Sequence, residues 1–235
     1  MPNDSKYRIL CTRPLRNSLI AAAGENGIHI VAHEFIQVKP LQQEALINDL
    51  QNATGRTMVF TSNNAVEILH QQYLAGRQLQ KPQVCCISGK TKQAVLRAFP
   101  DSVIPAAASY GKELAAAIIQ LQSIHEVSFF CGSQRRNDLP DTLKDAGIAV
   151  HEYVIYETVA TPVIAGDYDG VIFFSPSAVN SYFSANTLKH TAVCFAIGHT
   201  TAATVKEHTG NKIITSTGTD EQSMVQTAIH YFNNI

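Results

Sequence analysis

The chain has 235 residues, of which 45% are hydrophobic and 16% charged, with a formal net charge of −1. This composition is typical of a globular protein with one large domain or two small ones. It argues against a general nucleic-acid binder, which would carry a marked positive charge, and against a membrane protein, because no apolar run is long enough for a span.

Apolar, β-rich runs alternate with helical patterns along the chain. Strands are predicted at Arg8–Thr12, within Ile28–Val38, and at Met58–Thr61, Val84–Ile87, Val103–Pro105, Val127–Cys131, Ala149–Tyr156, Asp169–Phe174, Val193–Ile197 and Ile213–Thr215. Helices are predicted near Asn17–Ala23 and Gln42–Gln51, from Ser62 through Gln72, from Lys90 to Phe99, at Lys112–Leu121, near Leu139–Ala146, after Ser175, from Gly198 to His208, and at Glu221–Phe232. This alternation predicts an α/β fold with parallel sheets.

One strand-to-helix pattern occurs twice, at Thr57–Leu69 and at Gly170–Phe183. Each copy is a short apolar run, a hydroxyl residue and an amphipathic helix. Ser62 and Ser175 are predicted to be the helix N-caps, and Pro176 suits the first helical position, where its missing N–H has no cost. The backbone N–H groups at such a helix start favour an anionic ligand.

The two halves of the chain also match each other in sequence. Cys11, Arg16-Asn17, Gly27-Ile28 and His33-Glu34-Phe35 align with Cys131, Arg136-Asn137, Gly147-Ile148 and His151-Glu152-Tyr153, and Ile87-Ser88-Gly89-Lys90-Thr91 aligns with Ala196-Ile197-Gly198-His199-Thr200. This internal repeat predicts two similar α/β units. Ligands of such sheets bind at the carboxyl ends of the strands, so we expect the site in the cleft between the units.

The cysteines and histidines do not indicate a metal site. The five cysteines fall inside or at the end of apolar runs, their number is odd and no CxxC occurs. We therefore expect buried free thiols in a reducing compartment, which favours a cytoplasmic location, and the N-terminus lacks a secretory apolar core. The nine histidines are scattered, without an HExxH motif.

An ordered set of motifs resembles the uroporphyrinogen-III synthase family over nearly the whole chain. The set is Thr12-Arg13-Pro14, FTSNNAV, VIYET, FFSPSAV and AIGHTTA. The resemblance implies two flavodoxin-like parallel-sheet domains joined by a two-stranded linker. One domain would comprise 1–38 plus 160–235 and the other 39–159, with the crossings near Val38–Pro40 and Thr158–Pro162.

The resemblance also implies the reaction. Members of this family cyclise the linear tetrapyrrole hydroxymethylbilane, with inversion of its last pyrrole ring, to uroporphyrinogen III. They use no cofactor. Water leaves the hydroxymethyl carbon, and the resulting azafulvene cation is attacked by the last pyrrole to give a spiro intermediate. The expected partners are this substrate and, transiently, hydroxymethylbilane synthase. We expect a monomer that binds neither nucleic acid nor membrane.

Tyr156 matches the family's tyrosine, which is placed to assist departure of the hydroxyl as a hydrogen-bond donor. A strand tyrosine that only packs at the domain junction is the alternative. The expected substrate-binding residues lie at turns after strands; they are Arg13, Ser62, Gly89, Lys90, Thr91, Ser175, Gly198, His199, Thr200 and Thr201. For the serines and threonines the alternative is helix capping alone, for the glycines a tight turn, and for the charged residues a solvated position.

Two other functions stay open from the sequence. A catalytically inactive tetrapyrrole-binding paralogue would have the same fold, although Tyr156 and FFSPSAV argue against it. An α/β protein that binds a phosphorylated metabolite or a nucleotide is the third. Neither GxGxxG nor GxxxxGK[ST] occurs in the chain, which argues against that reading.

Overall fold

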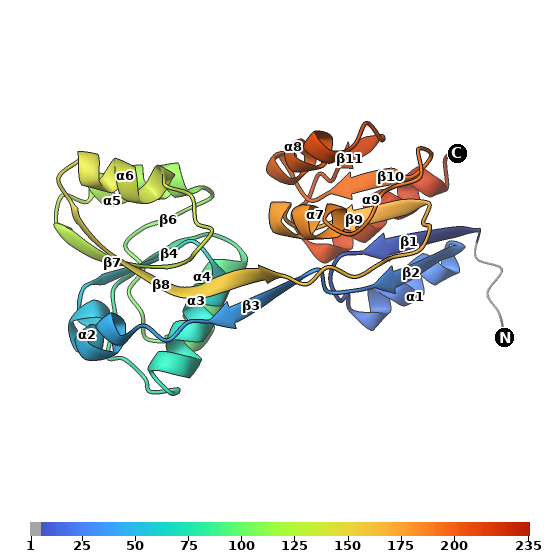
Figure 1. Ribbon diagram of the computed structural model, residues 1–235. Helices are drawn as coiled ribbons and strands as arrows, with labels where there is room; N and C mark the ends of the chain where they lie inside the picture. Colours follow the sequence, from blue (N-terminus) through green and yellow to red (C-terminus); the bar gives the residue numbers. More distant parts are fainter. Residues whose placement is uncertain (1–5) are drawn as a thin grey trace. The chain divides into compact units, whose positions relative to one another are not determined.

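The computed structural model describes residues 6–235, and the chain divides into two compact units (Figure 1). Unit 1 comprises Met1–Gln37 and Val159–Ile235, and unit 2 comprises Val38–Thr158. Each unit is built on its own sheet, and the predicted α/β class with two mainly parallel sheets is confirmed. Among the described residues, no helix has the length and apolar character that crossing a membrane requires.

Unit 1 has a five-stranded parallel sheet in the order β11-β10-β9-β1-β2. Its strands are β1 (Tyr7–Cys11), β2 (Ile28–Ala32), β9 (Gly170–Phe173), β10 (Val193–Ala196) and β11 (Ile213–Thr215), and its helices are α1 (Asn17–Glu25), α7 (Pro176–Phe183), α8 (His199–His208) and α9 (Glu221–Phe232). Counted along the chain within the unit, this is the flavodoxin-like order 2-1-3-4-5.

The central strands β9 and β10 of unit 1 are buried on both faces, as expected for a parallel sheet with helices on each side. Ile9 and Cys11 of β1 pack with α1 and α9, while Leu10 between them packs on the other face with α7 and α8. The two faces form separate cores because neighbouring strand residues point to opposite sides. This layering leaves the strand ends, where the loops lie, open to a ligand.

Unit 2 has a six-stranded sheet in the order β3-β8-β7-β4-β5-β6. Its strands are β3 (Ile36–Pro40), β4 (Thr57–Phe60), β5 (Val84–Ile87), β6 (Ala107–Ala108), β7 (Glu126–Gly132) and β8 (Ala149–Ala160), and its helical segments are α2 (Glu44–Gly55), α3 (Asn63–Ile68), the π-helical turn η1 (Leu69–Tyr73), α4 (Lys90–Ala98), α5 (Gly111–Gln120) and α6 (Asp138–Asp145). Helices α2, α3 and α4 pack on one face of the sheet, and α5 and α6 on the other.

Two adjacent strands carry the chain between the units, as the fold class predicts. β3 begins at Ile36 in unit 1 and ends in unit 2, and β8 runs in the reverse sense from unit 2 to Ala160 in unit 1. The run Ile28–Val38 therefore contains β2 and the start of β3, which belong to different sheets. The prediction found only the first of these strands, because the break at residues 33–35 contains neither glycine nor proline.

Three predicted elements differ from the structure. The strand at Val103–Pro105 is wrong: Val103 makes only an isolated bridge to Gln83, and β6 lies at Ala107–Ala108, past a proline that has no N–H for the ladder. The helix expected through Gln72 is α-helical only to Ile68 and continues as η1. Tyr156 does not end its strand, because β8 continues four residues further, to Ala160.

The strand order of the two sheets agrees with some of the residue pairs that the sequence repeat aligns, and disagrees with others. With β7 and β8 taken as first and second strands, β8-β7-β4-β5-β6 has the same 2-1-3-4-5 order as unit 1, so β7 corresponds to β1 and β4 to β9. His151 lies inside β8 opposite Ser128, whereas His33 follows the end of β2. These histidines are therefore not equivalent in the sheets, and the sequence repeat itself stays a prediction.

All five cysteines are buried and none forms a disulfide. Burial raises the pKa of Cys11 and Cys194 to about 12 and that of Cys85 and Cys131 to about 11. Since the thiolate is the reactive form, these thiols act as small apolar core residues at neutral pH.

Candidate active site

The candidate catalytic residues lie at the switch point of the sheet in unit 2. This point lies between the neighbouring strands β4 and β7. On one side of it the chain continues through β4, β5 and β6, and on the other side it continues through β7 and β8. Open α/β sheets bind ligands beside the carboxyl ends of the strands at such a point. Ser62 follows β4, and Gly132 is the last residue of β7.

Ser62 caps α3, as predicted. Its backbone is extended, and its Oγ accepts a hydrogen bond of 3.2 Å from the Asn64 backbone N–H. The same oxygen accepts the Tyr156 hydroxyl at 3.0 Å. Within the described residues the Ser62 hydroxyl donates to no acceptor, so its hydrogen is available to a ligand. The Ser62 Oγ thus caps α3 and also binds the Tyr156 hydroxyl.

Tyr156 reaches Ser62 from β8 by passing over Gly132 of the intervening strand. Gly132 is paired with Tyr156 in the sheet, where the β7–β8 ladder has an irregularity between Cys131 and Gly132. The Ser133 N–H donates to the Tyr156 carbonyl at 2.9 Å. A Cβ atom on residue 132 would lie 2.5 Å from Tyr156 Cζ and 2.9 Å from its hydroxyl oxygen. Only glycine leaves room for the ring in this position.

The Tyr156 phenol is neutral at ordinary pH. Burial raises its pKa above the usual value, although the hydrogen bond with Ser62 acts in the opposite direction. A buried, protonated phenol is a hydrogen-bond donor and a weak acid, and it does not serve as a base. This is the protonation state that assistance to a departing hydroxyl requires.

The turn before α4 carries three predicted binding residues. Gly89 has φ +77°, a left-handed conformation that favours glycine. Lys90 is exposed at the first position of α4, where it can meet an anion, whereas Thr91 is 6% exposed and faces the core. Of the three, the Lys90 side chain and the backbone of the turn are open to a ligand.

Unit 1 has an equivalent switch point between β1 and β9. Thr12 follows β1 and is buried, with its hydroxyl donating to the Ile172 carbonyl at 2.9 Å. Ser175 follows β9 and caps α7: its Oγ accepts from the Ala178 N–H at 3.2 Å, and Pro176 occupies the first helical position. The predicted capping of both helices is therefore confirmed.

Arg13 lies at the same edge but already has a partner. Its guanidinium donates to Glu221 at 2.5 Å and lies 4.0 Å from the centre of the Phe174 ring. Arg16 also approaches Glu221, at 3.4 Å. A ligand carboxylate would have to compete with Glu221 for Arg13. No sequence pattern indicates this pairing, since the two residues are 208 positions apart.

The turn before α8 resembles the one before α4 in its exposure but not in its backbone. Gly198 has φ −174°, an extended conformation open to any residue, and a Cβ there would meet nothing within 4 Å. His199 and Thr200 are exposed at the start of α8, while Thr201 is 4% exposed. The exposed pair and the N-terminal backbone of α8 are therefore the parts that can meet an anion.

The predicted site residues thus form separate groups within the units. In unit 2 the structure brings Tyr156 and Ser62 together, and it adds Gly132, which was not among the predicted site residues. Its signal in the sequence is a glycine at the end of a strand, directly after the apolar run Phe129–Cys131. Among residues 6–235, no cluster of three or more His, Cys, Asp or Glu residues is placed to hold a metal ion.

Comparison with known proteins shows the family. The model of the family described as uroporphyrinogen-III synthase HemD matches residues 17–226. Among solved structures, uroporphyrinogen-III synthetase from Helicobacter pylori is similar, with a TM-score of 0.72 and 16% identity, covering 96% of this chain and 99% of that one. A mutant uroporphyrinogen III synthase from the extremely thermophilic bacterium Thermus thermophilus has a TM-score of 0.64 and 15% identity, covering 97% of this chain and 100% of that one.

At these identities the structural matches show the fold. A search of curated proteins gave no match. The family model covers most of the chain, including both candidate serines and Tyr156, and on this match the protein belongs to the uroporphyrinogen-III synthase family.

Proposed function

We propose that Tyr156 is the catalytic residue with which this uroporphyrinogen-III synthase starts its reaction. The enzyme cyclises hydroxymethylbilane, with inversion of the last pyrrole ring, to uroporphyrinogen III in tetrapyrrole biosynthesis. The observation that carries the proposal is the hydrogen bond from the Tyr156 hydroxyl to Ser62 at the switch point of unit 2.

The first step is loss of the hydroxyl group from the hydroxymethyl carbon. As this C–O bond breaks, the electrons leave with oxygen, and the pyrrole nitrogen supplies the pair that forms the azafulvene cation. We infer that the Tyr156 O–H turns from Ser62 to the departing oxygen and donates its hydrogen bond there. The oxygen leaves as hydroxide and becomes water with the proton that the last pyrrole releases when the ring closes. A positioned donor of this kind contributes about 10²–10⁴-fold to a rate.

Ser62 has two parts in this proposal. It holds the phenol in the free enzyme, and it caps α3 with the same oxygen. When the phenol turns to the substrate, the Ser62 hydroxyl stays at the carboxyl end of β4 and can donate its own hydrogen to a substrate carboxylate. Ser62 is thus a positioning and binding residue, and Tyr156 is the one that touches the reacting atoms.

The substrate carries eight carboxylates, and the remaining predicted residues would bind some of them. Lys90 and Gly89 in unit 2, and Arg13, Ser175, Gly198, His199 and Thr200 in unit 1, all lie at the carboxyl ends of strands or at helix N-termini. Backbone N–H groups and cations there favour carboxylates. Thr91 and Thr201 would contribute through their backbone, because their side chains are buried.

Three further points of the proposal concern the setting of the enzyme. We propose that it acts as a monomer, in the cytoplasm, and receives its unstable substrate by transient contact with hydroxymethylbilane synthase. The buried, unpaired cysteines support a reducing compartment.

A coupled assay tests the proposed activity. Hydroxymethylbilane is generated from porphobilinogen by its synthase, this protein is added, and the oxidised porphyrins are separated by isomer. We expect mainly the type III isomer. Only the spontaneous type I isomer, from protein with a cooperative unfolding transition, would overturn the activity and favour the inactive paralogue, which no present observation supports.

A further inference from the structure

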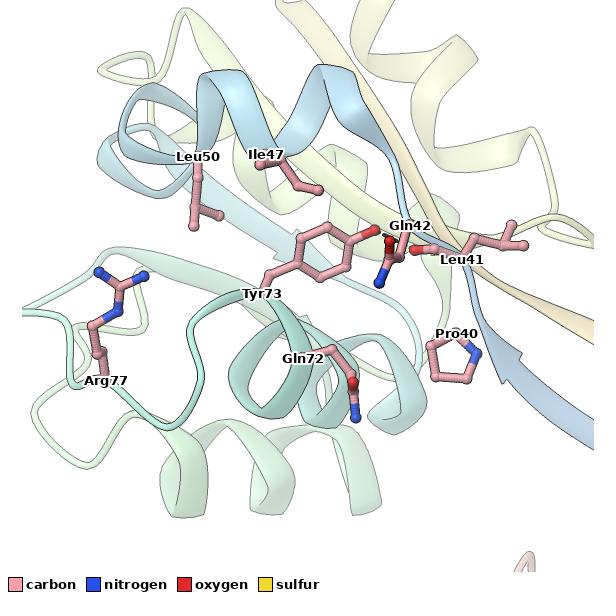
Figure 2. A pocket seen from close by; sticks show the side chains of 8 residues that line it. All are labelled: Pro40, Leu41, Gln42, Ile47, Leu50, Gln72, Tyr73 and Arg77. Carbon is pink, nitrogen blue, oxygen red and sulfur yellow. Dashed lines mark hydrogen bonds between the residues drawn. The ribbon is translucent and has the colours of Figure 1, made fainter.

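Unit 2 contains a groove that is separate from the candidate active site. A cavity of about 560 Å³ lies between α2 and the end of η1 with the segment that follows it (Figure 2). It is lined by Pro40, Leu41, Gln42, Ile47, Leu50, Gln72, Tyr73 and Arg77. None of these residues belongs to the Tyr156–Ser62–Gly132 group, so the proposed reaction does not use this cavity.

The groove continues along α2. A second cavity of about 510 Å³ shares Ile47, Leu50 and Arg77 with the first. A third of about 690 Å³ shares Gln51, Thr54 and Leu79 with the second. The α2 residues that line the three cavities are 47, 48, 50, 51, 54 and 55, and most of them have the spacing of one helix face. The groove therefore follows one side of α2 from Ile47 to its end at Gly55.

The charge of the groove favours an anion. Its described lining residues include two cations, Arg77 and Lys81, and no aspartate or glutamate, in a chain that has 19 of these acids. Arg77 Nε donates to the Leu74 carbonyl at 3.1 Å, and within the described residues no carboxylate pairs with this side chain. Its two terminal amino groups are thus placed to bind a carboxylate in a bidentate manner.

Beside Arg77, the lining combines the polar side chains of Gln42 and Gln72 with a group of apolar and aromatic side chains. Ile47 and Leu50 point from α2 toward the Tyr73 ring (Figure 2), and Ile47 is 54% exposed. The ring is held in place because the Tyr73 hydroxyl donates to the Leu41 carbonyl and accepts the Gln43 N–H at 3.1 Å. A flat apolar group can lie between these side chains without displacing them.

The backbone that forms the other wall is unusual. η1 is a π-helical turn, and Ala75 and Lys81 have left-handed φ values of 49° and 43°. Such conformations are disfavoured for residues other than glycine, and they concentrate at functional sites. Three uncommon local structures within residues 69–81 thus shape the groove.

We propose that this groove binds a small aromatic acid, with the ring between Ile47, Leu50 and Tyr73 and the carboxylate on Arg77. The apolar and aromatic side chains would select the ring, the guanidinium would select the acid, and the cavity has room for a ligand of this size. The proposal is independent of Tyr156, because binding is measured without turnover.

The test is a titration of the full-length ¹⁵N-labelled protein with 3-phenylpropionate, followed by NMR chemical shifts. The expected shifts fall on the amides of residues 41–51 and 72–81. Propionate, which lacks the ring, and 3-phenylpropan-1-ol, which lacks the charge, are expected to bind at least several-fold more weakly. Shifts confined to other regions, no binding up to the solubility limit, or equal binding of all three compounds would overturn the proposal.

Two pairs of variants locate the contacts. Arg77→Gln is expected to weaken 3-phenylpropionate about tenfold, because it removes a charge-assisted pair, while Arg97→Gln on the exposed surface of α4 has no effect. Ile47→Ser is expected to weaken binding, and Leu96→Ser, another exposed apolar residue, is not. If the two variants of each pair bind 3-phenylpropionate equally well, and their thermal stability is unchanged, the binding site is not this groove.

The same chemistry is found in simple phenyl acids and in pyrroles with acid side chains. Porphobilinogen, a pyrrole with two carboxylates, is therefore titrated in parallel. Tighter binding than 3-phenylpropionate would assign the groove to pyrrole acids, and equal binding would assign it to aromatic acids in general.

Discussion

The Tyr156 hydroxyl donates a hydrogen bond of 3.0 Å to Ser62, and this bond spans three neighbouring strands of the sheet in unit 2. Tyr156 is on β8, Ser62 follows β4, and β7 lies between them. The phenol can cross β7 only because that strand ends in Gly132. The position of the hydroxyl therefore depends on the absence of a side chain at residue 132.

Gly132→Ala is expected to displace the Tyr156 ring. The added methyl group would lie 2.5 Å from Cζ, so ring or strand must move. We expect a loss of about 1–3 kcal/mol in the free energy of unfolding, from overpacking, and a fall of about 100-fold in kcat, from misplacement of the hydroxyl. Urea unfolding and the coupled assay measure the two effects.

The double variant Gly132→Ala/Tyr156→Val is the control for this explanation. It removes the ring that the methyl group would strike, so Gly132→Ala should cost less stability in the Tyr156→Val background than in the unchanged protein. An equal cost in the two backgrounds would show that Gly132 is needed for another reason, such as the irregularity in the β7–β8 ladder.

Ser62→Ala and Ser175→Ala form a matched pair. Each removes one helix cap, so each should lower the free energy of unfolding by about 1 kcal/mol. Only Ser62 also holds Tyr156, so only Ser62→Ala should lower kcat in addition to weakening substrate binding. Equal kcat values for the two variants would argue against a role for Ser62 in placing the phenol.

Arg13→Gln is expected to raise KM about tenfold with little change in kcat, if Arg13 exchanges Glu221 for a substrate carboxylate. Arg16→Gln is the control, because Arg16 has the same partner at a longer distance and a side chain that is 63% exposed. Initial rates at several substrate concentrations separate the two parameters. A KM for Arg13→Gln within twofold of the control would leave Arg13 as the partner of Glu221 only.

Tyr153→Phe is expected to reduce the acid sensitivity of the fold. The Tyr153 hydroxyl donates to Asp49 at 2.7 Å and is the largest cause of the lowered pKa of that carboxyl, to which Asn52 and Arg56 also contribute. A lowered pKa in the folded state stabilises the protein above the unfolded value, near 4, and this contribution is lost as pH falls through the folded value.

The measurement is urea unfolding at pH 7 and at about pH 3. Tyr153→Phe should lose less stability between the two pH values than the unchanged protein, while Tyr110→Phe, whose residue is 68% exposed, should behave like the unchanged protein. A wild-type pH dependence in Tyr153→Phe would mean that Asp49 keeps its low pKa without the phenol.

Much of the fold could be predicted because each strand-to-helix unit carries its own signals. Ser62 and Ser175 with Pro176 identified the two caps, and buried apolar runs identified most of the strands. The errors arose where the local sequence pattern predicts a strand that the hydrogen bonds of the sheet do not continue. Val103 has the right side chain for a strand, but pairing beyond its single bridge resumes only after Pro105, and residues 33–35 separate two sheets without a breaker.

The contacts of the candidate site were less accessible from sequence. The Gly132 requirement arises from a tyrosine on the neighbouring strand, and Arg13 meets a glutamate 208 positions away, so both depend on the tertiary fold. The exposure of a turn residue also depends on helix phase, which is why Thr91 and Thr201 are buried beside exposed Lys90 and Thr200. No sequence motif indicates the groove along α2, because its cations Arg77 and Lys81 stand singly in a polar segment.

The catalytic role of the Tyr156 hydroxyl is tested by the kcat of Tyr156→Phe in the coupled assay, with Tyr153→Phe as the control from the same strand. Phenylalanine keeps the ring over Gly132 and removes only the hydroxyl that donates to Ser62. We predict that Tyr156→Phe lowers kcat about 100-fold or more and lets the type I isomer accumulate, while Tyr153→Phe stays near the unchanged protein at neutral pH. A kcat for Tyr156→Phe within about twofold of the unchanged protein would contradict this role, because the donor would then make too small a contribution for catalysis.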